Sequence, residues 1–173
     1  MDSHPALIFL VASIFIPYNA YAYDEKAEVN ILLNSLPYTR SEIIASRYLG
    51  AIIYMLLAIG VTSLALFVFN RPFTMTDISI GGGLFLVFAA FTFPLFYIFK
   101  QGSITMVVIV SFLILAAVGP AFVRFLATHL TAISDFIVNS STSFLYAGAA
   151  VVVLTLYALS WGVTTFIYQR KAF

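Results

Sequence analysis

Five long apolar runs are the feature that most constrains what this chain can fold into. A helix needs about 20 predominantly apolar residues to cross a bilayer core of roughly 30 Å. Five stretches reach or approach that length, and the first is the shortest. The predicted spans are residues 5–21, 43–69, 78–99, 104–125 and 144–168. Because their apolar residues run on without alternation, they predict membrane-spanning helices and not the strands of a membrane barrel.

The composition supports one transmembrane domain over residues 1–173, an all-α polytopic bundle. Of 173 residues, 62% are hydrophobic and only 9% are charged, whereas soluble domains carry roughly 25% charged residues. A net charge of +1 gives a nucleic-acid partner no electrostatic support. The chain has no cysteine and two histidines, His4 and His129. We therefore expect no disulfide, metal site or cofactor on the chain itself.

The positions of Lys and Arg set the predicted orientation, since cytosolic loops carry an excess of these residues. If residues 23–47 lie in the cytosol, six basic residues lie inside and two outside. The inside set is Lys26, Arg40, Arg47, Lys100, Arg170 and Lys171, and the outside set is Arg71 and Arg124. This choice predicts an extracellular amino terminus and a cytosolic carboxyl terminus.

A cleaved signal peptide is the alternative interpretation of the first run. Residues 6–16 resemble the apolar core of such a peptide, and residues 20–22 have the small-x-small form of a cleavage site. The leading residues MDSHP, however, contain an acid and no Lys or Arg, whereas signal peptides begin with a positive segment. Cleavage would also place the charged segment outside. We therefore favour a first span.

Residues 24–40 form the most polar segment of the chain. Asp24 and Glu25 suit the amino-terminal end of a helix, where the dipole is positive. Four apolar residues then follow at the spacing of one helical face. They are Val29, Leu32, Leu33 and Leu36. Pro37 ends this short amphipathic helix. Thr39 to Glu42 then form a predicted capping box that begins the next helix.

Two interpretations of this amphipathic helix are open. In a structural or regulatory membrane protein it would lie on lipid headgroups or bind some other cytosolic partner. Alternatively, it would dock on a dedicated protein subunit. Interfacial anchors are usually rich in Lys and Arg, whereas this helix begins with two acids. That difference favours a protein partner.

The run YDEKAEVNILLNSLPYTRSEIIASRYLG, residues 23–50, resembles a segment typical of bacterial type-2 ABC transporter permeases, in the subgroup of small six-span exporter subunits. The shared elements are Asp24-Glu25, Ser35-Leu36-Pro37, Arg40, Glu42-Ile43 and Arg47. FPLFYIFKQG, residues 93–102, is similar to the P-L-x-Y-x-F-G close of the family's fourth span, although Lys100 and Gln101 intervene before Gly102. With the layout of the spans, the resemblance covers nearly the whole chain.

The resemblance implies a non-catalytic permease subunit of an ATP-driven exporter in the bacterial plasma membrane. In this family the helix between the second and third spans is a coupling element that docks on a separate ATPase subunit, which binds ATP and Mg. The residues implied to contact that subunit are Asp24, Glu25, Glu28, Val29, Leu32, Leu33, Leu36 and Arg40. The other implied partner is a second permease copy or a paralogue, and the implied cargo is a peptide, an antibiotic or another amphipathic molecule. Six-span relatives also imply a further span before the first run seen here.

Three local features complete the predictions. Gly119 and Pro120 predict a kink and a possible hinge, as Pro37 does at the polar segment. The glycine run at residues 81–83 predicts close helix packing. Apolar residues at helical spacing in 126–143 predict a short extracellular surface helix. We expect no ionisable residue deep within a span, which argues against a proton-coupled transporter, an ion channel or an intramembrane protease.

Overall fold

The computed structural model is built of long helices and describes residues 4–26, 37–99, 104–129 and 141–170. These ranges contain five helices and no strand. The helices are α1 (Pro5–Lys26), α3 (Arg40–Val68), α4 (Met75–Ile98), α5 (Ile104–His129) and α7 (Thr142–Arg170). All five are long and apolar enough to cross a membrane. The predicted all-α polytopic fold is therefore confirmed.

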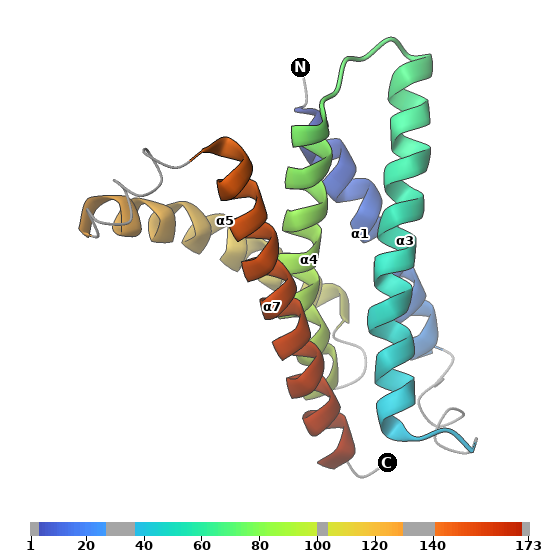
Figure 1. Cartoon of the computed structure of the whole chain (residues 1–173). Coiled ribbons are helices and arrows are strands. Elements are labelled where there is room, and N and C mark those ends of the chain that lie inside the picture. Colours follow the sequence, from blue (N-terminus) through green and yellow to red (C-terminus); the bar gives the residue numbers. More distant parts are fainter. Residues whose placement is uncertain (1–3, 27–36, 100–103, 130–140, 171–173) are drawn as a thin grey trace.

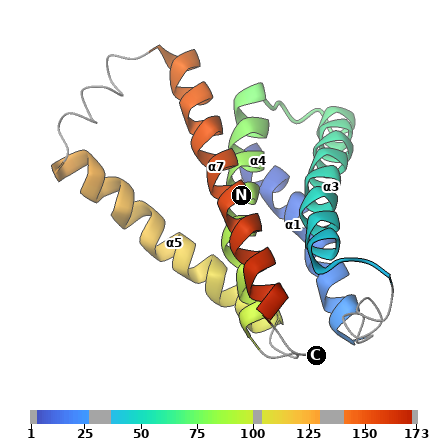
Figure 2. The same ribbon diagram turned by 60° about the horizontal axis from the view of Figure 1, so that its bottom comes forward.

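Four of the helices pack side by side, and α4 lies between the others (Figure 1). α4 packs against α7 and α1, α1 packs against α3, and α3 also contacts α7. The remaining helix, α5, starts against α4 and then diverges from the bundle, as Figures 1 and 2 both show. Among the α5 side chains that the structure describes, only Val107 and Ser111 are buried. Most of α5 therefore presents apolar surface outward.

Gly81 allows α4 to approach α1 closely. A Cβ atom at this position would lie 2.7 Å from Cβ of Phe9 and 2.9 Å from the carbonyl oxygen of Ala6. The second of these atoms belongs to the backbone of α1 and cannot move aside alone. A Cβ at Gly83 would meet nothing within 4 Å. The predicted packing role of the glycine run is confirmed at Gly81.

Both ends of α3 are fixed by local hydrogen bonds. At its start, the Glu42 N–H donates to Thr39 Oγ1 at 3.3 Å, and the Thr39 N–H donates to Glu42 Oε2 at 2.7 Å. This is the predicted capping box. At its end, Asn70 adopts φ 51°, and the N–H groups of Asn70 and Arg71 donate to carbonyls of the last turn. That arrangement is a Schellman motif, in which Asn tolerates the left-handed conformation.

The start of α4 has a capping box that sequence reasoning missed. Thr74 is its N-cap, and its hydroxyl accepts from the Asp77 N–H at 3.2 Å. The Asp77 carboxylate accepts from the Thr74 N–H at 2.9 Å. The pattern Thr-x-x-Asp just before an apolar run was the available signal.

The end of α1 differs from the prediction. The sequence predicted a span ending at residue 21 and a new helix beginning at Asp24, but α1 runs unbroken to Lys26. Neither Gly nor Pro occurs between residues 18 and 26, so no residue there interrupts the helix. Asp24 and Glu25 therefore lie in the last turn of α1, where the dipole disfavours acids. The ion pair described below offsets that effect for Asp24.

Several predictions lie partly or wholly outside the described residues. Residues 27–36, with the predicted contacts Glu28, Val29, Leu32, Leu33 and Leu36, lie outside the described residues. So do residues 130–140 of the predicted surface helix. Residues 126–129, with which that helix was expected to begin, instead continue α5. α5 passes through Gly119 and Pro120 as one helix. A hinge at these two residues stays a prediction.

Candidate functional site

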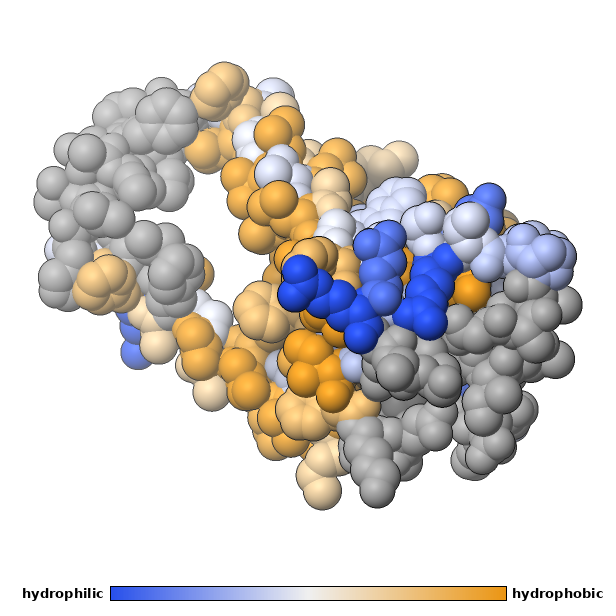
Figure 3. Space-filling view, turned by 90° about the horizontal axis from the view of Figure 1, so that it is seen from below, coloured by the Kyte–Doolittle hydropathy of each residue, from blue (hydrophilic) through white to orange (hydrophobic). Residues whose placement is uncertain are grey.

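The candidate site is one end of the bundle, where α1, α4 and α7 end and α3 begins (Figure 1). We call it the coupling end, because residues 27–36 connect α1 to α3 there. Figure 3 looks onto this end and shows hydrophilic side chains gathered beside apolar surface. Arg40, Arg47 and Arg170 all belong to it, whereas Arg71 follows α3 at the opposite end. These four arginines are thus divided between the two ends as the sequence predicted, and which end faces the cytosol stays a prediction.

An ion pair joins α1 to α3 at this end. Asp24 Oδ2 lies 2.8 Å from Arg47 Nη1. The Arg47 side chain is only 12% exposed, against 37% for Asp24. Its guanidinium carbon also lies 4.7 Å from the centre of the Tyr21 ring, a cation–π contact with α1. A guanidinium this deeply placed requires a partner, because desolvating an unpaired charge is costly.

Arg40, the first residue of α3, reaches α7. Its Nη1 donates to the carbonyl oxygens of Tyr168 at 3.2 Å and of Gln169 at 3.0 Å. These carbonyls lie in the last turn of α7, where no N–H within the helix is available to them. A cation there is also favoured by the helix dipole. Arg40 was predicted as a contact of the ATPase subunit, and that role stays a prediction beside the contact seen here.

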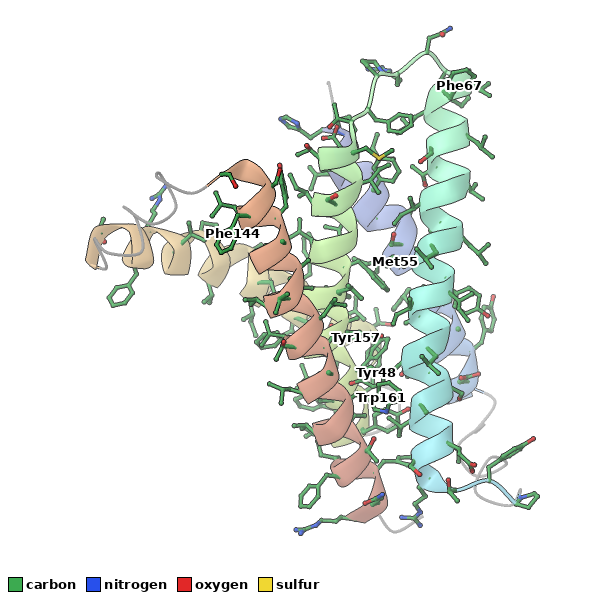
Figure 4. The ribbon with its side chains drawn as sticks, viewed as in Figure 1. Tyr48, Met55, Phe67, Phe144, Tyr157 and Trp161 are labelled. Atoms are coloured by element: carbon green, nitrogen blue, oxygen red, sulfur yellow. The ribbon has the colours of Figure 1, made fainter. Side chains whose placement is uncertain are left out.

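Deeper in the bundle, the fully buried Tyr48 joins α3 to α7. Its hydroxyl lies 2.8 Å from Ser160 Oγ and 2.7 Å from Thr164 Oγ1. The Tyr157 hydroxyl donates to the Tyr48 carbonyl at 2.9 Å. The Trp161 ring stacks on the Tyr48 ring with centres 5.8 Å apart. Figure 4 shows Tyr48, Tyr157 and Trp161 together between α3 and α7.

The same cluster repairs a defect in α4. Pro94 lies inside α4 and has no N–H, so the carbonyl of Ala90, four residues earlier, lacks its usual helical donor. Ser160 Oγ on α7 donates to that carbonyl at 2.6 Å. Hydroxyls from neighbouring helices are one way in which membrane proteins satisfy a carbonyl freed by proline. The bond therefore ties α7 to α4 beside Tyr48.

A groove of about 660 Å³ lies between the start of α3 and the end of α7. Its walls combine aromatic, small and polar side chains. They include Ser41, Glu42, Ala45, Trp161, Gly162 and Phe166. Ser41 and Glu42 are exposed at its edge. The coupling end therefore offers a concave surface between α3 and α7.

The structure brings only some of the predicted site residues together. Asp24 and Glu25 end α1, Pro37 lies in a bend before α3, and Arg40 begins α3. Gly119 and Pro120 lie on α5, in its outer half. Sequence reasoning missed the contacts of Arg47, Tyr48 and Ser160. Only the position of Arg47 near a span end signalled that it needs a polar partner.

The contacts at the coupling end hold helices together and include no cluster of catalytic side chains among the described residues. Within the described ranges, no group of three His, Asp or Glu residues could hold a metal ion. What the coupling end contains is a set of directional contacts that join α1, α3, α4 and α7. Such contacts fix how the helices lie against one another and leave a polar face available to a partner.

Five helices of membrane length define a multi-pass membrane protein. The chain belongs to the ABC-2 family: the model described as "ABC-2 family transporter protein" matches residues 1–169. The resemblance drawn from residues 23–50 and 93–102 is thereby confirmed. The chain is the permease component of an ABC transporter. No curated protein and no solved structure matched it.

Proposed function

We propose that the chain is the membrane subunit of an ATP-driven exporter, coupled to separate ABC ATPase subunits through residues 24–36. The observation that supports this proposal is that α1 ends and α3 begins at the same end of the bundle, where Arg47 binds Asp24 and Arg40 binds the last turn of α7. A displacement of the segment that connects α1 to α3 would therefore act on helices that are joined by polar contacts.

The segment suits a docking helix. Its apolar residues Val29, Leu32, Leu33 and Leu36 have the spacing of one face, which would fill a groove on the ATPase subunit. Glu25 and Glu28 would meet basic residues at the rim of that groove. Beyond the segment, Pro37 and the capped start of α3 would pass on the motion stiffly. In this proposal ATP and Mg bind the ATPase subunits and the chain itself hydrolyses nothing.

The coupling end faces the bacterial cytosol in this proposal, so the carboxyl terminus is cytosolic. The gathering of Arg40, Arg47 and Arg170 at that end supports the orientation by the positive-inside rule. A second permease copy or a paralogue completes the transporter within the lipid bilayer. The apolar surface of α5, which diverges from the bundle, is available to that copy or to lipid.

The proposed cargo is a peptide, an antibiotic or another amphipathic molecule. Aromatic, aliphatic and hydroxyl side chains predominate in the described spans, and charged residues such as Arg47 and Asp77 lie towards span ends. A pathway lined by such side chains would suit a molecule with apolar surface and scattered polar groups better than it would suit ions. Photocrosslinking of candidate cargo to the spans tests this assignment. Labelling confined to lipid-facing positions would contradict it.

The coupling itself is tested by co-purification with the ATPase subunit, identified as a neighbouring gene product with a Walker A loop. We expect the wild-type chain to recover that subunit and the Leu32→Asp, Leu36→Asp double variant to lose it while still inserting in the membrane. The matched control is Asn30→Asp with Asn34→Asp, which adds the same charge to the polar face. That control should keep the ATPase subunit.

Two outcomes contradict the proposal. If the double leucine variant still recovers the ATPase subunit, the contact lies outside the leucine face. If the wild-type chain purifies alone from cells that express the neighbouring genes, it does not work with that ATPase. The second outcome would favour a structural or regulatory role for this member of the family.

A further inference from the structure

The end of α1 is attached to α3 by more than apolar packing. Tyr21 is buried against the Phe93 and Phe96 rings of α4, with ring centres 5.2 and 4.5 Å away. Arg47 of α3 lies over the same Tyr21 ring and binds Asp24 one turn further along α1. One guanidinium therefore holds two residues of the last turns of α1. This contact stands immediately before residues 27–36.

Directional contacts and apolar contacts restrain helices differently. In a bilayer, lipid is as apolar as a neighbouring helix, so apolar contacts between helices depend on close van der Waals packing and lack a hydrophobic driving force. A charged hydrogen bond of 2.8 Å fixes the register of the two helices, because it weakens steeply when its length and angle change. The Arg47 side chain has limited access to water at 12% exposure, whereas Asp24 is 37% exposed.

We infer that Arg47 is a positioning residue that fastens the end of α1 to the first turns of α3, so that a displacement of residues 27–36 moves α1 and α3 together. This inference rests on the proposed coupling function. It gives Asp24 a different task from the one the resemblance implied. Its carboxylate acts through Arg47 within the chain, and the apolar face of residues 27–36 remains the part that meets the ATPase subunit.

The rest of α3 is suited to pass such a displacement across the membrane. The helix runs from Arg40 to Val68 without proline, and its start is locked by the Thr39–Glu42 capping box. A displacement applied beyond Pro37 therefore enters α3 directly. Residues 27–36 also follow α1 directly in the chain, and the Arg47 pair ties the last turns of α1 to α3, so that the two helices respond together.

Reporter cysteines at the opposite end of the bundle measure whether the two helices move together. The chain contains no cysteine, so a single introduced cysteine reacts without background from this chain, and the complex without it is the control. Leu7, near the start of α1, and Val68, the end of α3, are 51% and 71% exposed. Each would carry one cysteine in the intact transporter complex in nanodiscs. The rate of reaction with a water-soluble maleimide is compared with and without ATP and vanadate.

In the wild-type complex we expect ATP and vanadate to change the reaction rate at both positions. Arg47→Asp places two acids together. It should reduce the nucleotide-dependent change in reaction rate at Leu7→Cys by at least about fivefold and leave the change in rate at Val68→Cys unaltered. The charge swap, Asp24→Arg with Arg47→Asp, should restore the change at Leu7→Cys to within about twofold of wild type. A merely structural role for Arg47 would instead weaken both reporters together.

The outcomes separate this inference from the proposed function. Failure of the wild-type chain to bind the ATPase subunit would overturn the proposed function. If the complex forms, an unaltered response at Leu7→Cys in Arg47→Asp overturns the inference. A charge swap that folds but does not restore that response overturns it as well, and so does a wild-type complex in which neither reporter responds.

Discussion

Removal of the Ser160 hydroxyl should cost more stability than an ordinary hydroxyl deletion, because Pro94 leaves its acceptor with no substitute. In Ser160→Ala the Ala90 carbonyl loses the donor at 2.6 Å, and the helix cannot supply one. Tyr48 loses one contact at 2.8 Å but keeps Thr164 at 2.7 Å. The main loss is therefore one orphaned carbonyl in the partly buried interface between α4 and α7.

The expected magnitude follows from these contacts. A buried acceptor left without a partner costs about 1–3 kcal/mol, whereas interhelical hydrogen bonds in membranes average about 0.6 kcal/mol. We expect Ser160→Ala to lower the free energy of unfolding by about 1.5 kcal/mol. In a Pro94→Ala background the backbone gains an N–H at this position, which can bond the Ala90 carbonyl within the helix. The same serine substitution should then cost about 0.5 kcal/mol, so the two changes are coupled by about 1 kcal/mol.

Equilibrium unfolding in mixed micelles with increasing dodecyl sulfate measures both values. Trp161, the one tryptophan of the chain, stacks on Tyr48 and reports on this interface by fluorescence. Thr155→Ala is the matched control on the same helix, since its hydroxyl bonds the Val151 carbonyl of its own helix at 2.7 Å. If the costs of Ser160→Ala in the two backgrounds agree within about 0.3 kcal/mol, Ser160 does not repair the proline defect.

Three further changes can be measured in the same unfolding assay. Tyr48→Phe should cost only about 1 kcal/mol, because the Ser160 and Thr164 hydroxyls still donate to the carbonyls of Ala90 and Ser160; a loss above about 3 kcal/mol would refute this assignment of donors. Gly81→Ala should cost about 1–3 kcal/mol from the clash with the Ala6 carbonyl, while Gly83→Ala should be near neutral; equal effects would refute the close approach. Thr39→Val should cost about 1 kcal/mol by removing the cap of α3, and Thr39→Ser should retain it; if Thr39→Ser loses as much, the cap is not the cause.

The sequence predicted the features that depend on local pattern. Apolar runs of membrane length predicted the five helices, and the order Thr39 to Glu42 predicted the cap of α3. Both follow from residues within a few positions of one another. The extension of α1 past residue 21 was mispredicted because charged residues were taken as a helix start, although nothing in the sequence breaks the helix before Lys26.

The contacts at the coupling end depend on packing that the sequence does not contain. Pro94 indicates that a carbonyl in α4 needs a donor, but Ser160 lies 66 positions further along the chain and on another helix. Arg47 indicates a need for a partner without showing that α1 extends far enough to supply Asp24. The divergence of α5 was equally hidden, because lipid is as apolar as a neighbouring helix and hydropathy does not distinguish them.

The two halves of the α1–α3 interface differ in kind, and the difference bears on where the bundle can open. Towards residues 27–36, Asp24 and Tyr21 bind Arg47. Towards the opposite end, an apolar groove of about 710 Å³ lies between the helices, lined by residues such as Val11, Phe15 and Val61. Lipid can replace apolar contacts at little cost, but it cannot replace a paired guanidinium. We therefore expect a relative movement of α1 and α3 to cost least in the half away from residues 27–36.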